Sequence, residues 1–499
     1  MYSCVHTALN CTGHLSRPLG LTMMISINLD PDDQLPLVDQ IVHAIRRQID
    51  ERCLRPGTKL PSIRKFAASY GISRFTAVES YDRLVALGYL KARRGAGFFI
   101  TAVHEASDRR QLIGVQNRNE EMVSLIRRLL EAREDIVLAG GPWLPNAWMD
   151  EMGIRQSLAA VARKNGTHLI EYGNPYGYLP LREHLVLLLS ELGVKARASQ
   201  IVLTHGTSQA LDLIIRHYVK PGDAVLVDDP GYYNLFGNLR QHDARLLGIP
   251  RNSDGPDLAT LEQLAAEHRP RIYFTQSTLQ NPTGTDMSPH VAFRVLQLAE
   301  QFDFIIVEDD IFCDLQTRNT QRLAALDQLN RVIYARSFSK TLSGSLRVGF
   351  LAARQPIADD LAEVKMISSI TSSQLIERVL YAMLIDGHYR KFLTRLHKRL
   401  AESRLATIHA FERIGLELFV EAEAGMFLWG RFPHVGNSLA LTKSASNHGI
   451  MIAPGVVFRP HLEPSPWMRF NVTACDDPHV HRWLEHIATR DDWSLQAAE

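Results

Sequence analysis

The feature that most constrains the fold of this chain is a series of short apolar runs that recurs through its middle. The runs occupy residues 201–204, 224–227, 271–274, 304–307 and 332–334. Segments with the periodicity of helices separate them, and this alternation is typical of parallel strands joined by crossover helices. We therefore expect an α/β domain over residues 136–490, built on a mostly parallel sheet that helices cover.

Polar and aromatic residues follow the ends of these predicted strands. Thr207 and Ser208 open a helix after the first run, where backbone N–H groups can bind a phosphate. Tyr232 follows the second run and offers an aromatic face to a flat ring, and Asn281 follows the third and can donate to a phenolate oxygen. Singly, each has an ordinary alternative as a helix cap, a core tyrosine or a turn residue. Because ligands of open α/β sheets bind beyond the carboxyl ends of the strands, we expect these side chains to meet.

Lys340 follows the fifth run, between small hydroxyl residues. A lysine amine in its neutral form attacks an aldehyde to give a Schiff base. Ser337 and Arg347 flank this lysine and can hold an anionic group such as a phosphate. A lone lysine beside serines is more often a solvated loop residue, and the other strand-end residues are what favour the chemical interpretation here.

A run of three acids follows the fourth strand: Glu308, Asp309 and Asp310. We expect acids this close together to need a cation, because like charges raise each other's pKa. A pyridine ring that acts as an electron sink needs a carboxylate at its nitrogen, and Asp309 is the candidate. Together the strand-end residues predict one site for a pyridine cofactor that carries an aldehyde and a phosphate.

The N-terminal part, residues 35–101, has a different pattern. Apolar residues at positions 37, 41, 45 and 49 share one face of a first helix, and a second helix begins at Pro61-Ser62. A third helix over residues 74–86 should bury Val78, Tyr81 and Leu84. Short strands are expected at residues 88–90 and 97–100, which completes the layout of a winged helix-turn-helix.

The charge of this part supports a nucleic-acid partner. Residues 36–101 hold 12 Lys/Arg against 5 Asp/Glu, a net of +7, whereas the whole chain has a formal charge of +1. A local excess of this kind indicates double-stranded DNA, with a solvated basic face as the alternative. The residues expected to contact DNA gather at the recognition helix and the hairpin: Ser62, Arg64, Ser73, Arg74, Thr76, Arg93, Arg94 and Gly95.

The rest of the chain carries weaker signals. We expect residues 1–34 to form a disordered N-terminal segment, with Met23 or Met24 as an alternative translation start, and residues 102–135 to form a linker. The cysteines are scattered and form no CxxC pair, which favours a reducing, cytoplasmic compartment over a disulfide scaffold or a metal site. No stretch is apolar enough to suggest a membrane span.

Two sets of motifs carry a resemblance to known families. The runs LPSIR at 60–64, GISRFT at 71–76, YDRL at 81–84 and GYL at 88–90 resemble the GntR-family DNA-binding domain. The runs YGNP at 172–175, NPTG at 281–284, SFSK at 337–340 and WMRFN at 467–471 resemble the fold-type-I pyridoxal-phosphate aminotransferases. This order of domains resembles the MocR subfamily of GntR regulators, and it implies a smaller C-terminal α+β subdomain and a homodimer.

The resemblance implies a role for each residue of the site. Lys340 would form a Schiff base with pyridoxal 5'-phosphate, Asp309 would pair with the ring nitrogen, and Arg469 would bind a substrate carboxylate, with a surface ion pair as the alternative for Arg469. The other implied roles are phosphate binding by Thr207, Ser208, Ser337, Arg347 and Tyr172 (the last from a neighbouring subunit), stacking by Tyr232, and a bond to the ring hydroxyl by Asn281.

The sequence departs from the aminotransferase pattern at one informative place. Ile311 and Phe312 stand where the family usually has a tyrosine that bonds the ring hydroxyl. The loss of this donor argues against efficient transamination and leaves cofactor binding intact. Three functions stay open: a regulator in which an amino compound displaces Lys340 and shifts DNA affinity, a working aminotransferase with a secondary DNA-binding domain, and a repressor that senses pyridoxal phosphate itself.

Overall fold

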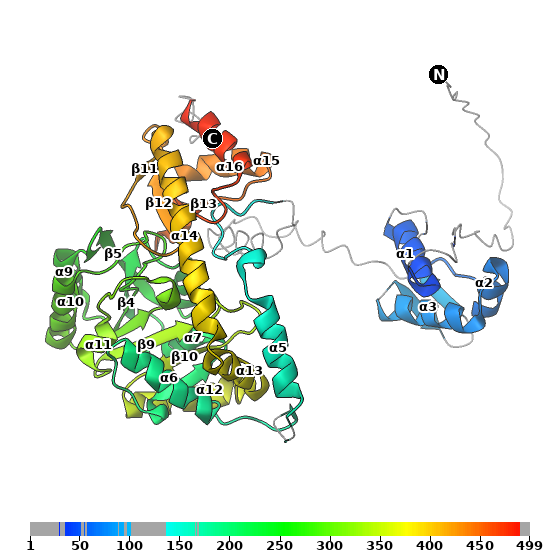
Figure 1. Cartoon of the computed structure of the whole chain (residues 1–499), viewed down its shortest axis with the longest axis horizontal. Helices are drawn as coiled ribbons and strands as arrows, with labels where there is room; N and C mark the ends of the chain where they lie inside the picture. Colours follow the sequence, from blue (N-terminus) through cyan, green and yellow to red (C-terminus); the bar gives the residue numbers. More distant parts are fainter. Residues whose placement is uncertain are drawn as a thin grey trace. The chain divides into compact units, whose positions relative to one another are not determined.

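A computed structural model describes residues 29, 35–50, 54, 57–87, 89–93, 97–100, 136–164, 166 and 169–489 of the 499-residue chain (Figure 1). These residues fall into two compact units, one within Met1–Val115 and one within Gln116–Glu499, and each is described by itself. No helix among the described residues is long and apolar enough to cross a membrane.

The N-terminal unit contains three helices and a hairpin. Helices α1 (Leu37–Asp50), α2 (Ile63–Tyr70) and α3 (Arg74–Ala86) precede strands β1 (Leu90–Arg93) and β2 (Gly97–Ile100), which pair antiparallel. The side chains of Ile41, Ile45, Phe66, Tyr81 and Leu84 are fully buried and form its core. Glycine is required at one turn, because Gly71 ends α2 with a φ of 65°, in the left-handed region that glycine adopts without strain.

All three predicted helices are present, and the bounds of the third are confirmed. The second begins at Ile63, the first strand lies at Leu90–Arg93 rather than at residues 88–90, and one core assignment is wrong. Ser62 and Ser73 cap α2 and α3 by accepting from backbone N–H groups, as serines at this position commonly do. Tyr81 and Leu84 are buried as expected, but Val78 is 38% exposed. Val78 lies on the side of α3 that faces away from the core, whereas Ala77 takes the buried place beside it.

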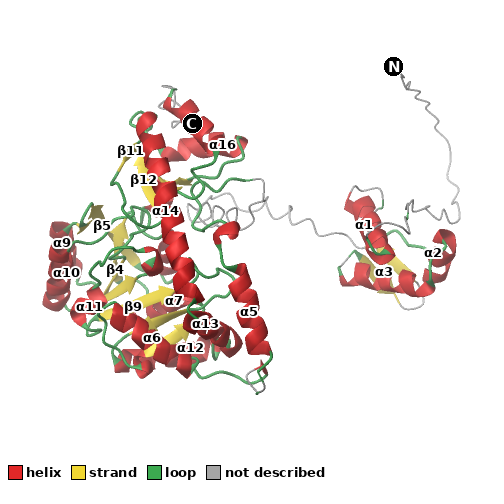
Figure 2. Ribbon diagram, in the orientation of Figure 1, coloured by secondary structure: helices red, strands yellow, loops and turns green. Residues whose placement is uncertain are grey.

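The large unit is a three-layer α/β domain (Figure 2). Its eight-stranded sheet has the order β3-β10-β9-β8-β7-β4-β5-β6. The strands are β3 (Ile201–Thr204), β4 (Ala224–Asp229), β5 (Arg245–Asn252), β6 (Gly255–Pro256), β7 (Ile272–Thr275), β8 (Ile305–Asp309), β9 (Val332–Ser337) and β10 (Gly349–Ala352). The pairs among β5, β4, β7, β8 and β9 are parallel, and β10 runs antiparallel to both β3 and β9.

Helices cover both faces of this sheet, so its central strands are buried on both sides and read as continuous apolar runs. Alternate residues of β3 enter different cores: Val202 packs with one cluster and Leu203 with the other. The helices are α5 (Glu151–Ala162), α6 (Leu179–Glu191), α7 (Gly206–Tyr218), α8 (Tyr233–Gln241), α9 (Leu258–His268), α10 (Pro289–Phe302), α11 (Leu323–Asp327), α12 (Gln355–Ser369) and α13 (Gln374–Ile385).

The 26-residue helix α14 (His388–Arg413) leads into a smaller C-terminal α+β subdomain. Its antiparallel sheet has the order β11-β12-β14-β13. The elements are β11 (Glu417–Leu418), β12 (Phe427–Arg431), α15 (Leu441–Asn447), β13 (Ala453–Pro454), β14 (Trp467–Asn471) and α16 (Pro478–Ala488). The architecture agrees with the expected fold class, including this subdomain.

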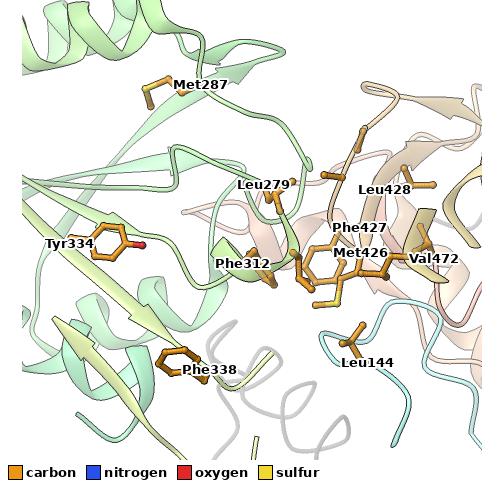
Figure 3. Close-up of a cluster of buried hydrophobic side chains, with 14 of the residues drawn as sticks. Leu144, Leu279, Met287, Phe312, Tyr334, Phe338, Met426, Phe427, Leu428 and Val472 are labelled. Carbon is orange, nitrogen blue, oxygen red and sulfur yellow. The ribbon is translucent and has the colours of Figure 1, made fainter. Parts of the chain in front are cut away.

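A cluster of buried side chains joins the two parts of the large unit. Figure 3 shows Phe312, which follows β8, beside Phe427 of β12, and their rings meet edge to face with centroids 5.3 Å apart. Leu144 and Met426 belong to the same cluster. The carboxyl ends of the large sheet therefore lie against the C-terminal sheet, and the candidate site is formed at this junction.

Candidate active site and DNA-binding face

Lys340 lies three residues beyond the end of β9 and is partly buried. Its amine donates to the backbone carbonyl of Pro142, with Nζ 2.9 Å from the oxygen, and lies 5.9 Å from the centroid of the Phe312 ring. Burial and the neighbouring Arg469 lower the pKa of Lys340 to about 7. A substantial fraction of this amine is therefore neutral and nucleophilic near pH 7.

Asp309 ends β8 and is 7% exposed. Its Oδ2 accepts from Gln276 Nε2 at 3.0 Å, whereas its Oδ1 is buried and has no hydrogen-bond partner. Burial is the main cause that raises the pKa of Asp309 to about 7, and Gln276 acts in the opposite direction. A buried carboxylate oxygen without a partner is costly, so a protonated ring nitrogen placed there would be bound strongly.

The two acids beside Asp309 correct the expectation that all three need a cation. Asp310 does pair with one, since it accepts from Arg322 Nε at 3.1 Å and from the Tyr334 hydroxyl at 2.8 Å. Glu308 is held instead by two backbone N–H groups at the start of α11 and has a pKa raised to about 7, mainly by burial. Asp309 alone of the three keeps an oxygen without a partner.

A phosphate-sized anion has a candidate place at the N-terminus of α7. Arg347 donates from Nη2 to the carbonyl of His205 at 3.1 Å, and a Cβ at Gly206 would come within 3.1 Å of the same nitrogen. The guanidinium thus lies over the first turn of the helix, where backbone N–H groups favour anions. Thr207 and Ser208, both predicted to bind phosphate, lie in this turn. Ser337, predicted with them, is the last residue of β9.

Tyr232 and Asn281 lie near Asp309. Tyr232, Gln276 and Asp309 line a small cavity at the ends of β4, β7 and β8. The Tyr232 hydroxyl accepts from Asn234 Nδ2 at 3.0 Å, and Asn281 is 4% exposed. Tyr232 thus shares a cavity with Asp309, and Asn281 is linked to Asp309 through Gln276, which accepts from the Asn281 N–H and donates to Asp309.

Arg469, in β14, is fully buried. It donates from Nη1 to Asn281 Oδ1 and from Nη2 to the Gly140 carbonyl, both at 2.7 Å, and its Nε has no partner. Among the described residues no carboxylate forms an ion pair with it. Burial lowers the pKa of Arg469, because its charged form is desolvated without an opposing charge. A carboxylate bound there would supply that charge.

Tyr172 is the site residue that the structure places apart from this cluster. Its side chain is 80% exposed, so its predicted contact with the phosphate of a neighbouring subunit stays a prediction.

The predictions missed a backbone segment that completes the site. Gly140, Gly141, Pro142 and Trp143 present carbonyl groups to Arg469, Asn471 and Lys340. The pair Gly140-Gly141 could have indicated a close backbone contact in this segment. A Cβ at Gly140 would lie 2.2 Å from the backbone nitrogen of Ala453, so only glycine fits there.

The predicted DNA-binding residues differ in what they can offer. Arg64 and Arg74 are exposed on α2 and α3, and the guanidinium of Arg93 lies 4.9 Å from the centroid of the Phe99 ring. The hydroxyls of Ser73 and Thr76 bond to each other at 2.8 Å within the first turn of α3. Arg94 and Gly95 lie outside the described residues.

An apolar surface on α3 was not predicted. Phe75 follows Arg74 in the first turn of the helix and is 76% exposed, on a helix that also exposes Val78. Such side chains can contact the methyl group of thymine, so they join the candidate DNA-binding face.

Two family models match the two parts of this chain. The family described as aminotransferase class I and II matches residues 150–487, and the bacterial regulatory proteins of the gntR family match residues 37–100. A probable rhizopine catabolism regulatory protein, MocR of Rhizobium meliloti, is 28% identical over 85% of this chain and 88% of its own length. The chain belongs to the aminotransferase class I and II family. It is a MocR-type regulator with a GntR helix-turn-helix domain.

Other proteins resemble one or both parts of this MocR-type regulator. An HTH-type transcriptional regulator of Bacillus subtilis, YdfD, is 28% identical over 85% of this chain and 90% of its own. The solved structure of LysN, an α-aminoadipate aminotransferase of Thermus thermophilus complexed with N-(5'-phosphopyridoxyl)-L-leucine, superposes with a TM-score of 0.67 at 25% identity, over 74% of this chain and 97% of that one.

Proposed function

We propose that this MocR-type regulator holds pyridoxal 5'-phosphate at Lys340 and changes its affinity for DNA when an amino compound with a carboxylate occupies the site. The observation that carries the proposal is the pair of buried polar atoms without partners, Asp309 Oδ1 and Arg469 Nε. The charges of both residues act on Lys340, since Arg469 lowers its pKa and Asp309 raises it. A cofactor ring with a protonated nitrogen would satisfy the first atom, and a carboxylate the second.

The residues present fit the cofactor. Pyridoxal phosphate would supply an aldehyde and a ring that withdraws electrons when its nitrogen is protonated. Lys340 would offer its partly neutral amine to the aldehyde, and Asp309 would pair with a protonated ring nitrogen. Tyr232 would cover one face of the ring, and Asn281 would bond its oxygen. The phosphate would lie at the N-terminus of α7 with Thr207, Ser208, Ser337 and Arg347.

The bound amino compound would be oriented by Arg469. The guanidinium lies 4.3 Å from the centroid of Phe427 and 5.0 Å from that of Phe458, so two rings fix its plane and exclude water. Such an arrangement suits bidentate binding of an anionic group such as a carboxylate. We therefore propose an amino acid, or another primary amine that bears a carboxylate, as the effector.

We propose that helix α3 and the exposed arginines beside it form the DNA-binding face. Arg74 and Phe75 begin the helix that would enter the major groove, and Arg64 and Arg93 would contact phosphates. We also propose a homodimer, in which the exposed Tyr172 reaches the site of the other subunit.

The test uses the full-length protein, with and without pyridoxal phosphate. The visible absorbance of lysine-bound cofactor should form, and borohydride should fix the cofactor to Lys340. DNA selected from a random library would then be titrated without cofactor, with cofactor, and with cofactor plus a panel of amino acids. A protein that forms no chromophore refutes the proposal. A change in affinity with cofactor alone, and none with any amine, would favour a repressor that senses the cofactor itself.

Aminotransferase activity is a second candidate, because the chain has Lys340, Asp309 and Arg469, to which the resemblance assigns the cofactor and substrate contacts. Phe312 argues against it, since this ring packs against Phe427 close to Lys340 and carries no hydroxyl. We expect Phe312→Tyr to raise the rate at which amino acids bleach the lysine-bound chromophore, by about tenfold if one hydrogen bond worth ~1.4 kcal/mol is gained. Phe293→Tyr, which makes the same change at an exposed position on α10, is the control. Rapid bleaching by the unchanged protein would make the enzyme the better interpretation.

A further inference from the structure

The segment 137–143 connects the predicted linker to the candidate site. At its start, the N–H of Val137 donates to Gly449 and the carbonyl of Val137 accepts from Met451, each at 2.9 Å. The N–H of Gly140 also donates to Met451 at 2.9 Å. This part of the segment is thus paired with the C-terminal subdomain by its backbone, as an extra strand would be.

Beyond Ala139 the segment is held by side chains of the site. Arg469 Nη2 donates to the Gly140 carbonyl at 2.7 Å, and Lys340 Nζ donates to the Pro142 carbonyl at 2.9 Å. Asn471 Nδ2 donates to the carbonyls of Gly141 and Trp143 at 2.9 and 2.7 Å. Three side chains thus hold this segment: Lys340, Arg469 and Asn471. The first two are also the residues that an effector's amine and carboxylate would engage.

We propose that the 137–143 segment senses the state of Lys340 and Arg469, and passes this state to the end of the linker that leads to the DNA-binding domain. This inference rests on the proposed function, because it requires that Lys340 captures the cofactor. It adds how occupation of the site would be communicated.

The chemistry of the amine changes the bond to Pro142. A neutral lysine amine carries two hydrogens. Condensation with an aldehyde forms a C=N bond and releases water, which takes both hydrogens and the carbonyl oxygen. The nitrogen then keeps at most one added proton, in the plane of the new double bond, and the donor to Pro142 is lost or redirected. A primary amine that takes over the C=N bond gives its two hydrogens to the lysine nitrogen and restores the donor.

The carboxylate changes the bond to Gly140. In a guanidinium, Nε and Nη2 form one edge with two parallel N–H groups, the edge that binds carboxylates in a bidentate manner. In Arg469 the Nε of this edge has no partner, and the Nη2 is bonded to the Gly140 carbonyl. A carboxylate at this edge would therefore compete with Gly140. An amine without a carboxylate should restore the segment's contacts, whereas one with a carboxylate should release Gly140.

Two small probes separate these effects in the full-length protein. Hydroxylamine frees Lys340 from the cofactor and has no carboxylate, whereas aminooxyacetate frees Lys340 and also brings a carboxylate. Hydrogen–deuterium exchange of peptides that cover residues 137–143 would be measured without cofactor, with pyridoxal phosphate, and after each probe. We expect cofactor loading to speed exchange about tenfold, since one lost hydrogen bond is worth ~1.4 kcal/mol. Hydroxylamine should return the slow rate, and aminooxyacetate should not.

The outcomes distinguish this inference from the proposed function. If the chromophore forms and the segment exchanges at one rate in all four states, the segment is not a sensor. If both probes restore the slow rate equally, Arg469 has no part in the signal. If no chromophore forms, the proposed function itself fails.

Asn471→Asp provides a second test. It keeps the Oδ1 that accepts from Thr473, and loses the two donors to Gly141 and Trp143. We expect fast exchange in every state and an unchanged chromophore. Under the proposal, hydroxylamine and aminooxyacetate should give the unchanged protein different affinities for DNA, and this difference should be lost in the variant. Asn330→Asp makes the same chemical change at an exposed position and should behave as the unchanged protein. A variant of Asn471 that keeps the difference between the probes would contradict the proposal.

Discussion

The two candidate sites of this protein present their charges in opposite ways. In the winged helix-turn-helix domain, Arg64 and Arg74 extend from the surface into solvent. In the aminotransferase domain, Asp309 and Arg469 are buried, and Lys340 partly so. Exposed charges act on a polyanion at long range and are screened by salt, whereas buried charges act at short range on a ligand that replaces their lost solvation.

The difference shows how one chain can combine the two partners. The exposed arginines need no fixed geometry until DNA aligns them, so a small core beneath them is sufficient. The buried charges need a large scaffold, because each lies on a different element: Asp309 ends β8, Lys340 follows β9 and Arg469 belongs to β14. A substitution at either site should therefore leave the structure of the other intact, and the following predictions test this.

The largest effect is expected from Lys340→Ala. Without the amine the lysine-bound chromophore should be absent, and borohydride should fix no cofactor to the chain. The affinity of the cofactor-free protein for DNA should be unchanged, and its response to amines should be lost. Absorbance and mass spectrometry would measure the first result and fluorescence anisotropy the second. Lys398→Ala, at an exposed position, is the matched control. A normal response of Lys340→Ala to amines would contradict the claim that the buried site acts through this lysine.

Arg74→Ala should weaken DNA binding without altering the cofactor site. Loss of a base contact costs ~1–3 kcal/mol, which is about tenfold or more in affinity, and loss of a phosphate contact reduces the salt slope by about one. Anisotropy titrations at several salt concentrations would measure both. Arg155→Ala removes an exposed arginine of the aminotransferase domain, paired with Glu151, and should change neither quantity. Equal effects of the two variants would mean that the positive charge is used non-specifically.

The last prediction concerns the dependence of stability on pH. The pKa of Asp309 is raised from 3.8 to about 7 in the folded protein, so between these values the folded state binds a proton that the unfolded state lacks. Stability of the cofactor-free protein should therefore be full below pH 3.8 for this group and fall as the pH rises towards 7, by up to about 1.4 kcal/mol per pH unit.

Asp309→Asn should remove that part of the slope. Denaturant unfolding at several pH values would measure it, and Asp386→Asn, at an exposed position, serves as control. Glu308, whose pKa is also raised to about 7, should maintain the remainder of the slope. An identical pH dependence in Asp309→Asn and the unchanged protein would show that this carboxylate is solvated, and the contrast between the two sites would weaken.

The sequence predicted the parts with strong local periodicity. The helices of the N-terminal unit were located from the spacing of their apolar residues, with Pro61-Ser62 and Gly71 marking the ends of the second, and five strands were found as apolar runs. The strands β5, β6 and β10 were missed. Gly248 and Pro250 interrupt the apolar pattern of β5, and β6 has only two residues. The run of β10, Gly349–Ala352, is apolar and was not recognised as a strand. The smaller C-terminal subdomain was expected from resemblance, because its strands are two to five residues long and give little periodicity.

The sequence by itself placed a lysine, a carboxylate and phosphate-binding residues at the ends of predicted strands. That was enough to propose one cofactor for them. Only the tertiary structure decided which groups satisfy one another. Lys340 meets Pro142 across 198 positions, and Arg469 meets Gly140 across 329. No local pattern signals such contacts, because a backbone carbonyl is present at every residue and burial alone determines which of them lacks water.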